Sequence, residues 1–323
     1  MSCAARGMAR SLAFALGLAS LAVHAADGKV ALVPFRTSPF PYQGEVPEQG
    51  RPFLDVDDGE RRGHATTRGG VYWEDPTYSD RRVLIAIPPG FDLRRRTVLV
   101  VFLHGNEATL ERDVHDRQQV PRQLAESGLN AVLVAPQFAV DARDSSAGRF
   151  WEPGVFAHFL DEAAEQAARV HGNPRLQNVL RRAPVVVVAY SGGYHAAAYA
   201  LAVGGAEKRI HGVVLLDALY GQEDKFAGWL ARRHRASFFL STYTESSRTG
   251  NETLQRLLGE RDIRFRPLEA MPKRLVNGTL AFLPVGADEL HQEFVSHAWT
   301  DDPLIDVFRR ITGYVYKPAH RAR

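Results

Sequence analysis

Short apolar runs recur between residues 81 and 286, and longer amphipathic stretches separate most of them. The apolar runs are RRVLIAIPP (81–89), TVLVVFLHG (97–105), NAVLVAPQ (130–137), PVVVVAYSG (184–192), HGVVLLDALYG (211–221), ASFFLSTYT (236–244) and TLAFLPVG (279–286). The helix-like stretches lie near 111–127, 154–170, 192–203, 223–234, 251–259 and 288–312. Continuous apolar strands that alternate with helices are typical of a parallel sheet buried on both faces. The pattern therefore predicts an α/β protein with an open, mostly parallel β-sheet and helices on both faces.

The start of the sheet is expected to differ from the rest. Only GFDLRRR joins the first two runs, a link short enough for an antiparallel hairpin. The later runs are separated by helices and are expected to be parallel. In sheets of this kind, sites form at the carboxyl ends of the strands. We therefore look for functional residues where the apolar runs end.

The first 68 residues do not follow the strand and helix pattern. Residues 1–25 combine a basic start, an uncharged apolar run and a small-x-small end at Ala25, which together are typical of a signal peptide. The apolar run is too short for a transmembrane anchor. Residues 26–68 are rich in Pro, Gly and charge, so we expect an extended N-terminal arm before a main domain at 69–323. Cleavage near Ala25 would make the protein periplasmic or secreted.

Export changes what the charge means. The chain carries 40 Lys and Arg against 37 Asp and Glu. Arg6 and Arg10 would leave with the signal peptide, so the exported chain would carry 38 basic and 37 acidic residues, a net charge of +1. No basic patch with interleaved aromatic residues stands out, so nucleic acid is not an expected partner. Cys3 is the only cysteine and would also be removed, leaving neither a disulfide nor a thiol nucleophile.

The stretch VVVVAYSGGYHAAAYAL at 185–201 points to Ser191 as a nucleophile. A strand turns directly into a helix there, so one residue must occupy a tight corner, with the small residues Ala189 and Gly193 two positions to either side. This is the A-x-S-x-G form of the nucleophile elbow. The N–H of Gly192 and the dipole of the following helix would favour negative charge in front of the serine. The alternative is an ordinary glycine-rich connection between a strand and a helix.

A second strand end could complete a site for an oxyanion. The run at 97–105 ends in His104-Gly105, followed by Asn106. Hydrolases of this architecture place the second N–H of the oxyanion hole after this strand, so we expect that of Asn106 to pair with the N–H of Gly192. The same three letters recur at 171–173, where Gly and Asn simply end a helix.

A serine nucleophile needs a general base and an acid that orients the base, and in this architecture they follow in the order Ser, acid, His. His291, shortly after the last strand, is favoured over His297, which lies in the expected closing helix. For the acid, Asp217 at the end of VVLLD is favoured over Glu245, which follows the next strand in a polar run. A carboxylate at the end of a buried strand is costly without a partner, and an imidazole would be one.

Specificity is expected from loops at the same edge of the sheet. The segment QFAVDARDSSAGRFWEPG at 137–154 is polar and then aromatic, and it lies where a cap loop could cover the site. Arg149 and Trp151 would line a pocket, with Arg248 facing them from another loop. Such an arginine pair would suit an anionic or sugar-rich acyl substrate, either a small molecule or a component of the cell envelope. The alternative is that these arginines face solvent and the aromatic residues pack the cap.

Residues 70–315 resemble the α/β-hydrolase superfamily in the elbow at Ser191, the HGN strand end and the late histidine. The stretch YSDRRVLIAIPPGFDLRRRTVLVVFLHGNEA is similar to the opening of esterase-type members. Ala189 departs from the family pattern, which has glycine at the first small position of the elbow. The resemblance implies the α/β-hydrolase fold and the chemistry of a serine hydrolase.

The implied reaction is cleavage of a carboxylic ester through an acyl-enzyme on Ser191. His291 would remove the serine proton, and the N–H groups of Asn106 and Gly192 would hold the oxyanion. No histidine has the spacing of a metal ligand, and neither a metal nor a cofactor is implied. Two alternatives remain: a serine peptidase or amidase that uses the same residues, and a hydrolase-fold protein that binds a ligand without turnover.

Overall fold

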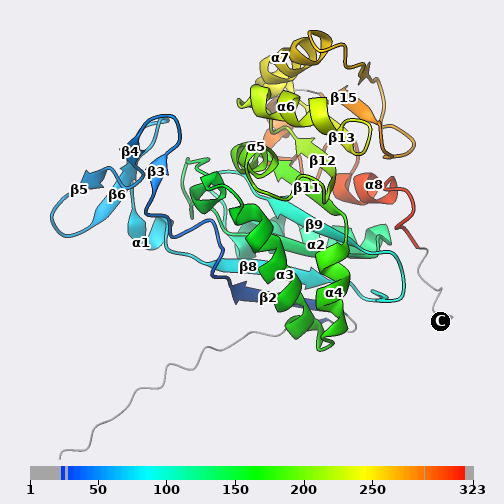
Figure 1. The fold of residues 1–323 in the computed structure, drawn as a ribbon, viewed down its shortest axis with the longest axis horizontal. Coiled ribbons are helices and arrows are strands. Elements are labelled where there is room, and N and C mark those ends of the chain that lie inside the picture. Colours follow the sequence, from blue (N-terminus) through cyan, green and yellow to red (C-terminus); the bar gives the residue numbers. More distant parts are fainter. Residues whose placement is uncertain (1–22, 26–27, 287, 317–323) are drawn as a thin grey trace, which may run out of the picture.

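The fold is built around one large sheet, shown in the computed structural model of Figure 1, which describes residues 23–25, 28–286 and 288–316. In these residues the sheet has ten strands in the order β1-β2-β8-β10-β9-β11-β12-β13-β15-β14. The strands are β1 (Val23–Ala25), β2 (Gly28–Pro34), β8 (Arg82–Ile87), β9 (Val98–Leu103), β10 (Ala131–Pro136), β11 (Val185–Tyr190), β12 (Ile210–Leu216), β13 (Phe238–Tyr243), β14 (Arg266–Pro267) and β15 (Leu280–Pro284). Pairing is antiparallel from β1 to β10 and parallel from there to β14.

Each of the seven apolar runs overlaps a strand, and only β12 begins outside its run, one residue earlier. The strands β9, β10, β11 and β13 are buried along their whole length, as expected for a sheet covered on both faces. Strand β11 lies between β9 and β12, so the strand that leads to Ser191 is central. The predicted fold class is confirmed.

The expected hairpin between the first two runs is wrong. Strand β10 lies between β8 and β9, antiparallel to β8 and parallel to β9. The antiparallel start of the sheet is correct, but the link between β8 and β9 crosses over a strand that comes later in the chain. A short link limits only the distance between two strand ends, and it spans either one or two strand positions.

Helices cover both faces of the sheet (Figure 1). One core contains the apolar sides of α3 (Val155–His171), α4 (Arg175–Arg182), α5 (Tyr194–Ala202), α6 (Glu223–Arg233) and α7 (Arg248–Gly259). The opposite core contains those of the π-helix η1 (Leu110–Arg117), α2 (Val120–Ser127) and α8 (Pro303–Arg309). The sequence did not predict α4. The single helix expected at 288–312 is instead the 3-10 turn η5 (Asp288–Glu293), a run of turns and α8, because Pro303 can begin a helix but cannot continue one.

The sheet begins inside the segment that was expected to be an arm. Strand β2 pairs with β8 from Lys29 to Pro34, and its short apolar run VALV does not stand out among the Pro and Gly residues around it. The rest of the arm, together with the residues at 71–73 that follow it, forms two small sheets, which project from the body in Figure 1. Their elements are β3 (Glu45–Val46) with β4 (Arg51–Pro52), and β5 (Val56–Asp57) with β6 (Arg62–Ala65) and β7 (Val71–Trp73), followed by α1 (Glu74–Thr77).

An aromatic cluster fixes the arm to the segment at 137–154. Phe53 is fully buried, and its ring contacts those of Tyr78 (centroids 4.9 Å apart) and Trp151 (5.8 Å). The N–H of Arg149 donates to the carbonyl of Pro39 at 2.8 Å. The expected cap loop is therefore a packed layer between the arm and the sheet.

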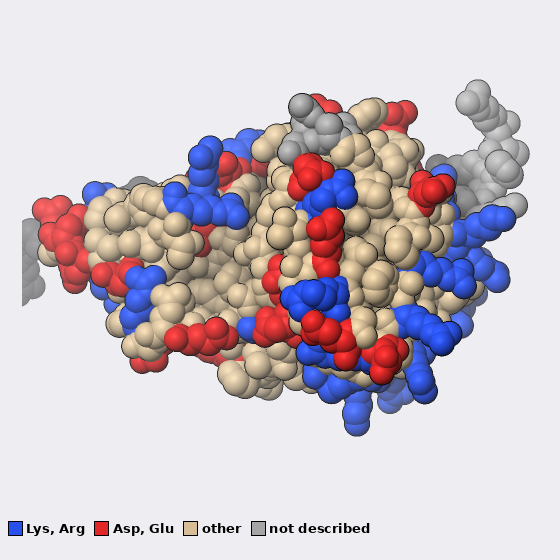
Figure 2. All heavy atoms as spheres, turned by 90° about the horizontal axis from the view of Figure 1, so that it is seen from above, with Lys and Arg blue, Asp and Glu red and all other residues tan. Residues whose placement is uncertain are grey.

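Most of the predicted signal peptide, residues 1–22, lies outside the described residues. Its last residues, Val23–Ala25, form β1 and pair with β2. None of the helices in the described part of the chain is long and apolar enough to cross a membrane. On the face in Figure 2, acidic and basic side chains lie interspersed across the middle of the molecule.

Candidate active site

Ser191 occupies a tight corner between β11 and α5. Its φ of +49° lies in the left-handed region, which residues other than glycine rarely adopt. The 3-10 turn η3 (Ser191–Gly193) leads directly into α5, so no loop separates the strand from the helix. A Cβ at Gly193 would lie 2.3 Å from the carbonyl oxygen of Leu103, and a Cβ at Gly105 would lie 2.9 Å from the Cβ of Ser191. Glycine at both positions lets the corner pack against the end of β9.

Three predicted side chains, from three separate parts of the chain, form one line of hydrogen bonds. Ser191 Oγ lies 3.0 Å from His291 Nε2, and His291 Nδ1 lies 2.6 Å from Asp217 Oδ2. With the ring proton on Nδ1, the imidazole donates to Asp217 and leaves Nε2 free to accept the serine proton. This is the geometry of a nucleophile, a base and an orienting acid.

Asp217 is held ionised by its surroundings. Its side chain has no exposed surface. Oδ1 accepts the N–H of Thr244 at 2.9 Å and the hydroxyl of Ser247, and Oδ2 accepts the hydroxyl of Thr244 at 2.8 Å. Burial opposes ionisation, but the hydrogen bonds from His291, Ser247 and Thr244 outweigh it and hold the pKa of Asp217 at about 2.

Two tyrosines that the sequence analysis did not single out fix the position of His291. The hydroxyl of Tyr190 donates to the backbone carbonyl of His291 at 2.7 Å, and the two rings stack with centroids 5.5 Å apart. Burial raises the pKa of Tyr190 to about 12, so this hydroxyl keeps its proton. The Tyr220 hydroxyl lies 3.3 Å from His291 Nδ1. Tyr190 is the residue before Ser191 in the elbow, so the same corner positions the serine and supports the histidine.

The alternative base and acid lie outside this line of hydrogen bonds. Glu245 is exposed, and its carboxylate pairs with Arg248 at 2.5 Å. His297 is more than half exposed, and its Nδ1 lies 3.1 Å from Asp301. The geometry therefore favours Asp217 and His291.

Asn106 and Gly192 lie against each other beside the serine. A Cβ at Gly192 would lie 2.2 Å from the terminal amide of Asn106, so any larger residue would displace that side chain. Among the backbone hydrogen bonds described for turns and loops, none has the N–H of Asn106 or of Gly192 as its donor. The Asn106 amide satisfies both of its ends when Nδ2 donates to the carbonyl of Asp144 (2.9 Å) and Oδ1 accepts from Arg68 (2.6 Å).

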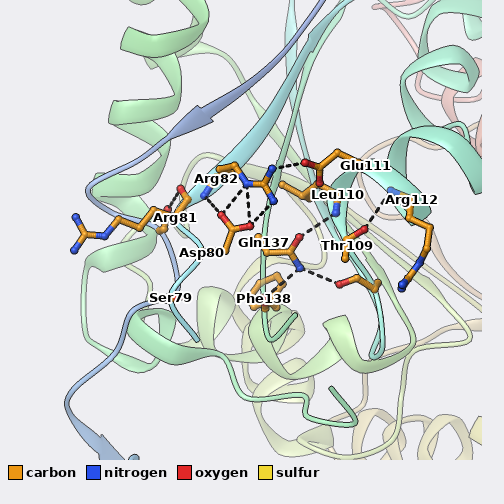
Figure 3. A network of polar contacts seen from close by, with 12 residues as sticks. Ser79, Asp80, Arg81, Arg82, Thr109, Leu110, Glu111, Arg112, Gln137 and Phe138 are labelled. Carbon is orange, nitrogen blue, oxygen red and sulfur yellow. Dashed lines mark hydrogen bonds and ion pairs between the residues drawn. The ribbon is translucent and has the colours of Figure 1, made fainter. Parts of the chain in front are cut away.

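A buried network holds the loop that carries Asn106. His104 Nδ1 donates to the carbonyl of Gly105 at 2.7 Å, and its Nε2 accepts the N–H of Phe138 at 2.9 Å. Burial lowers the pKa of His104, which keeps the ring neutral in this role. Gln137 accepts the N–H of Leu110 at 2.9 Å and donates to the carbonyl of Ala108 at 3.0 Å (Figure 3). The strand-end histidine is therefore structural, and it fixes the loop of Asn106 to the end of β10.

Ser191 and His291 open into a cavity of about 560 Å³, large enough for a small-molecule substrate. Asn106 and three arginines, Arg68, Arg117 and Arg143, also line it. Within the described part of the chain, no group of three or more His, Cys, Asp and Glu side chains could hold a metal ion.

The residues predicted to bind substrate do not line this cavity. Trp151 is buried in the aromatic cluster, and its indole N–H lies 3.3 Å from His195 Nε2. Arg149 donates to the carbonyl of Arg36 at 2.5 Å, and Arg248 pairs with Glu245. The aromatic signal at 150–151 therefore reflects packing. Arg68 was missed because it belongs to the arm, where no periodicity places a residue relative to the sheet.

The serine corner at the end of a central strand, with acid and histidine following in that order along the chain, is the arrangement of α/β-hydrolases. The strand topology thus confirms the fold that the resemblance implied.

No protein-family model and no curated protein matches this sequence. Solved structures similar to this chain include a feruloyl esterase module from Clostridium thermocellum complexed with sinapinate (TM-score 0.46, 10% identity, covering 89% of this chain and 100% of that one). Another is an S-formylglutathione hydrolase from Agrobacterium tumefaciens (TM-score 0.47, 11% identity, 90% and 98% covered). A third is a cold-adapted esterase from an Arctic intertidal metagenomic library (TM-score 0.45, 11% identity, 90% and 98% covered). With every one of these scores below 0.5, the assignment of function rests on the site itself.

Proposed function

We propose that this protein is a serine hydrolase that cleaves carboxylic esters through an acyl-enzyme on Ser191. The observation that carries the proposal is the line of hydrogen bonds from Ser191 through His291 to Asp217 at the wall of an accessible cavity. A serine hydroxyl is a weak nucleophile unless an adjacent base removes its proton, and here the base and the acid that orients it are both within hydrogen-bonding distance.

In the proposed reaction, Ser191 Oγ attacks the ester carbonyl while His291 Nε2 takes the hydroxyl proton. The N–H groups of Gly192 and Asn106 donate to the carbonyl oxygen as it becomes negative, and the dipole of α5 adds to this stabilisation. His291 returns the proton to the departing alkoxide, so an alcohol leaves and the acyl group stays on Ser191. A water molecule, deprotonated by His291, then attacks the acyl-enzyme, and His291 passes that proton to Ser191 Oγ as the acid is released.

We also propose that the protein is exported to the periplasm or secreted. The support is the signal-peptide pattern at 1–25. Cleavage after Ala25 would remove only β1 from one edge of the sheet, while Ser191, Asp217 and His291 lie after strands at its centre and far side.

Replacing Ser191 with alanine tests the catalytic proposal. We expect the wild type to hydrolyse p-nitrophenyl acyl esters and to be labelled by a fluorophosphonate, and we expect Ser191→Ala to lose labelling and about 10⁶-fold in kcat. Unchanged circular dichroism and melting temperature would show that the variant is folded. Residual activity above a few per cent of wild type would remove Ser191 from the role. Faster cleavage of peptide anilides than of esters would instead identify a peptidase or amidase.

A further inference from the structure

Three arginines line the cavity at Ser191, but two of them are already paired with carboxylates. Arg117 Nε lies 3.0 Å from Asp113 Oδ1, and Arg143 Nε lies 3.0 Å from Glu107 Oε1. For Arg68, no ion pair is present among the described residues. With the Asn106 amide in the orientation that satisfies both of its ends, the Arg68 guanidinium donates to Asn106 Oδ1 at 2.6 Å. Among the described side chains, Arg68 is therefore the one arginine of the cavity without a carboxylate partner.

Arg68 is close to the position of the reacting carbonyl. The Asn106 amide that it contacts is the group that packs against Gly192 beside Ser191. The positive charge of Arg68 also acts on Tyr194, whose pKa burial raises and the arginine opposes. One side chain thus separates Arg68 from the proposed oxyanion site.

A hydrogen-bonded turn between β6 and β7 holds Arg68 in this place. The N–H of Thr66 donates to the carbonyl of Gly70 at 3.1 Å, and the N–H of Gly69 donates to the carbonyl of Thr66 at 3.1 Å. Both glycines have φ near +90°, at 88° and 89°, as this turn requires. The arm is in turn anchored by Phe53, so the guanidinium is presented by a fixed loop.

We propose that Arg68 forms an anion subsite and that the favoured substrates are esters with a carboxylate or phosphate group near the scissile carbonyl. One N–H of the guanidinium contacts Asn106, and its remaining donors match the paired oxygens of a carboxylate or phosphate. The subsite deepens the proposed ester hydrolysis and rests on it. The sequence analysis also predicted an anionic substrate, but it assigned the recognition to Arg149 and Arg248.

The test compares esters that differ only in a distal charge. The esters are p-nitrophenyl butyrate, which is neutral, p-nitrophenyl hemisuccinate, which carries a carboxylate, and p-nitrophenyl 3-phosphonopropionate. The measured quantity is kcat/KM for each charged ester divided by kcat/KM for the butyrate. We expect this ratio to fall about tenfold in Arg68→Ala, the size of one charge-assisted hydrogen bond, with partial recovery in Arg68→Lys. The two charged esters show which anion the subsite prefers.

Arg61→Ala is the matched control. Arg61 comes directly before β6, with its guanidinium 3.8 Å from the centroid of the Trp73 ring and outside the cavity lining. Like Arg68→Ala, Arg61→Ala removes one positive charge from the arm. If the ratio of kcat/KM for charged and neutral esters falls equally in both variants, the effect is long-range electrostatic attraction, and the subsite is overturned. An unchanged ratio in Arg68→Ala would also overturn it, as would equal losses on all three esters, which would mean that Arg68 acts only through Asn106.

A binding measurement separates failure of the subsite from failure of the proposed function. Calorimetry would measure the binding of monoethyl succinate to Ser191→Ala and to the Ser191→Ala/Arg68→Ala double variant. This measurement does not depend on turnover. Binding about tenfold weaker in the double variant supports the subsite, even if the wild type hydrolyses no ester. Equal binding in both variants overturns the subsite, even if the esterase activity stands.

Discussion

Two residues of the candidate site hold backbone conformations that their side chains disfavour. Ser191 and Asp217 have φ values of +49° and +43°, and neither is glycine. Such conformations cost of order 1–3 kcal/mol each and persist only where the surrounding structure enforces them. Both residues directly follow neighbouring strands, β11 and β12. The strain is therefore concentrated where two side chains must leave the sheet and turn toward His291.

At the residue scale, the sharpest prediction separates the two candidate acids. Asp217→Asn removes the charge that orients the imidazole and favours the wrong tautomer of His291, so kcat should fall by about 10⁴. Glu245→Gln should leave kcat within about twofold, because a surface ion pair with Arg248 contributes little. Steady-state kinetics on one p-nitrophenyl ester is enough. A larger loss in Glu245→Gln than in Asp217→Asn would reverse the assignment.

The same pair of variants has a pH signature. The pKa of Asp217 is lowered to about 2 in the folded protein, so its ionised form favours folding. Its contribution to the free energy of unfolding is complete above about pH 4 and is lost as the pH falls through about 2. Denaturant unfolding should therefore show the gap between wild type and Asp217→Asn shrinking over that interval, with no such trend for Glu245→Gln.

At the scale of elements, the site depends on how closely α5 and β11 approach the end of β9. The turn at Gly193 passes so near Leu103 that even a methyl group would overlap its carbonyl. The small residues of the elbow are thus needed by the contact between elements and not only by the turn itself. Strand order matters equally, since it is the central position of β11 that sets Ser191 next to the loops after β9 and β12.

Gly193→Ala tests this contact. The added Cβ lies 2.3 Å from the Leu103 carbonyl oxygen, so backbone must move, and we expect about 1–3 kcal/mol of destabilisation together with a loss of kcat. Gly228→Ala in α6 is the control, because its Cβ would meet only the end of Arg232 at 3.7 Å. That change should stabilise the protein by about 0.5–1 kcal/mol. If denaturant unfolding shows that both variants change the free energy of unfolding in the same direction, the close contact at Gly193 is contradicted.

At the scale of the whole molecule, the arm and the sheet are one structure. Strand β2 forms part of the sheet, the aromatic cluster around Phe53 joins the arm to the segment at 137–154, and Arg68 reaches the cavity of Ser191. These contacts join the arm to the main domain that is expected to begin at residue 69. The arm supplies Arg68 to the wall of the cavity at Ser191. Removing the arm would therefore change the site itself and not only expose the surface beneath it.

Chains that begin at different positions test this arrangement. A chain that starts at residue 26 should keep its melting temperature and ester hydrolysis, since only the edge strand β1 is lost. A chain that starts at residue 35 also lacks β2, leaves the buried strand β8 with an unpaired edge, and should fail to fold or aggregate. The mass of the protein exported from a bacterium expressing the full chain should match a start at Ala26. The mass of the whole chain would contradict export by cleavage.

The part of the site that the sequence could predict is the part that strand ends determine. Ser191, Asp217 and Asn106 each follow an apolar run, and a parallel sheet brings such ends to one edge whatever the lengths of the connections. Arg149 and Trp151 were expected at the cavity from the composition of their segment and its place after a strand end, but packing against the arm directs them elsewhere. Their loop has no periodicity that would show which way a side chain points.

The sequence by itself determined the alternation of strands and helices, the corner at Ser191 and the chemistry available at the strand ends, because these depend on interactions between residues close in the chain. Only the tertiary structure decided that β10 lies between β8 and β9, that Asp217 and not Glu245 meets His291, and that Arg68 reaches the cavity. Those outcomes depend on contacts between distant segments, where several arrangements satisfy the same local pattern and the packing of the whole chain selects one.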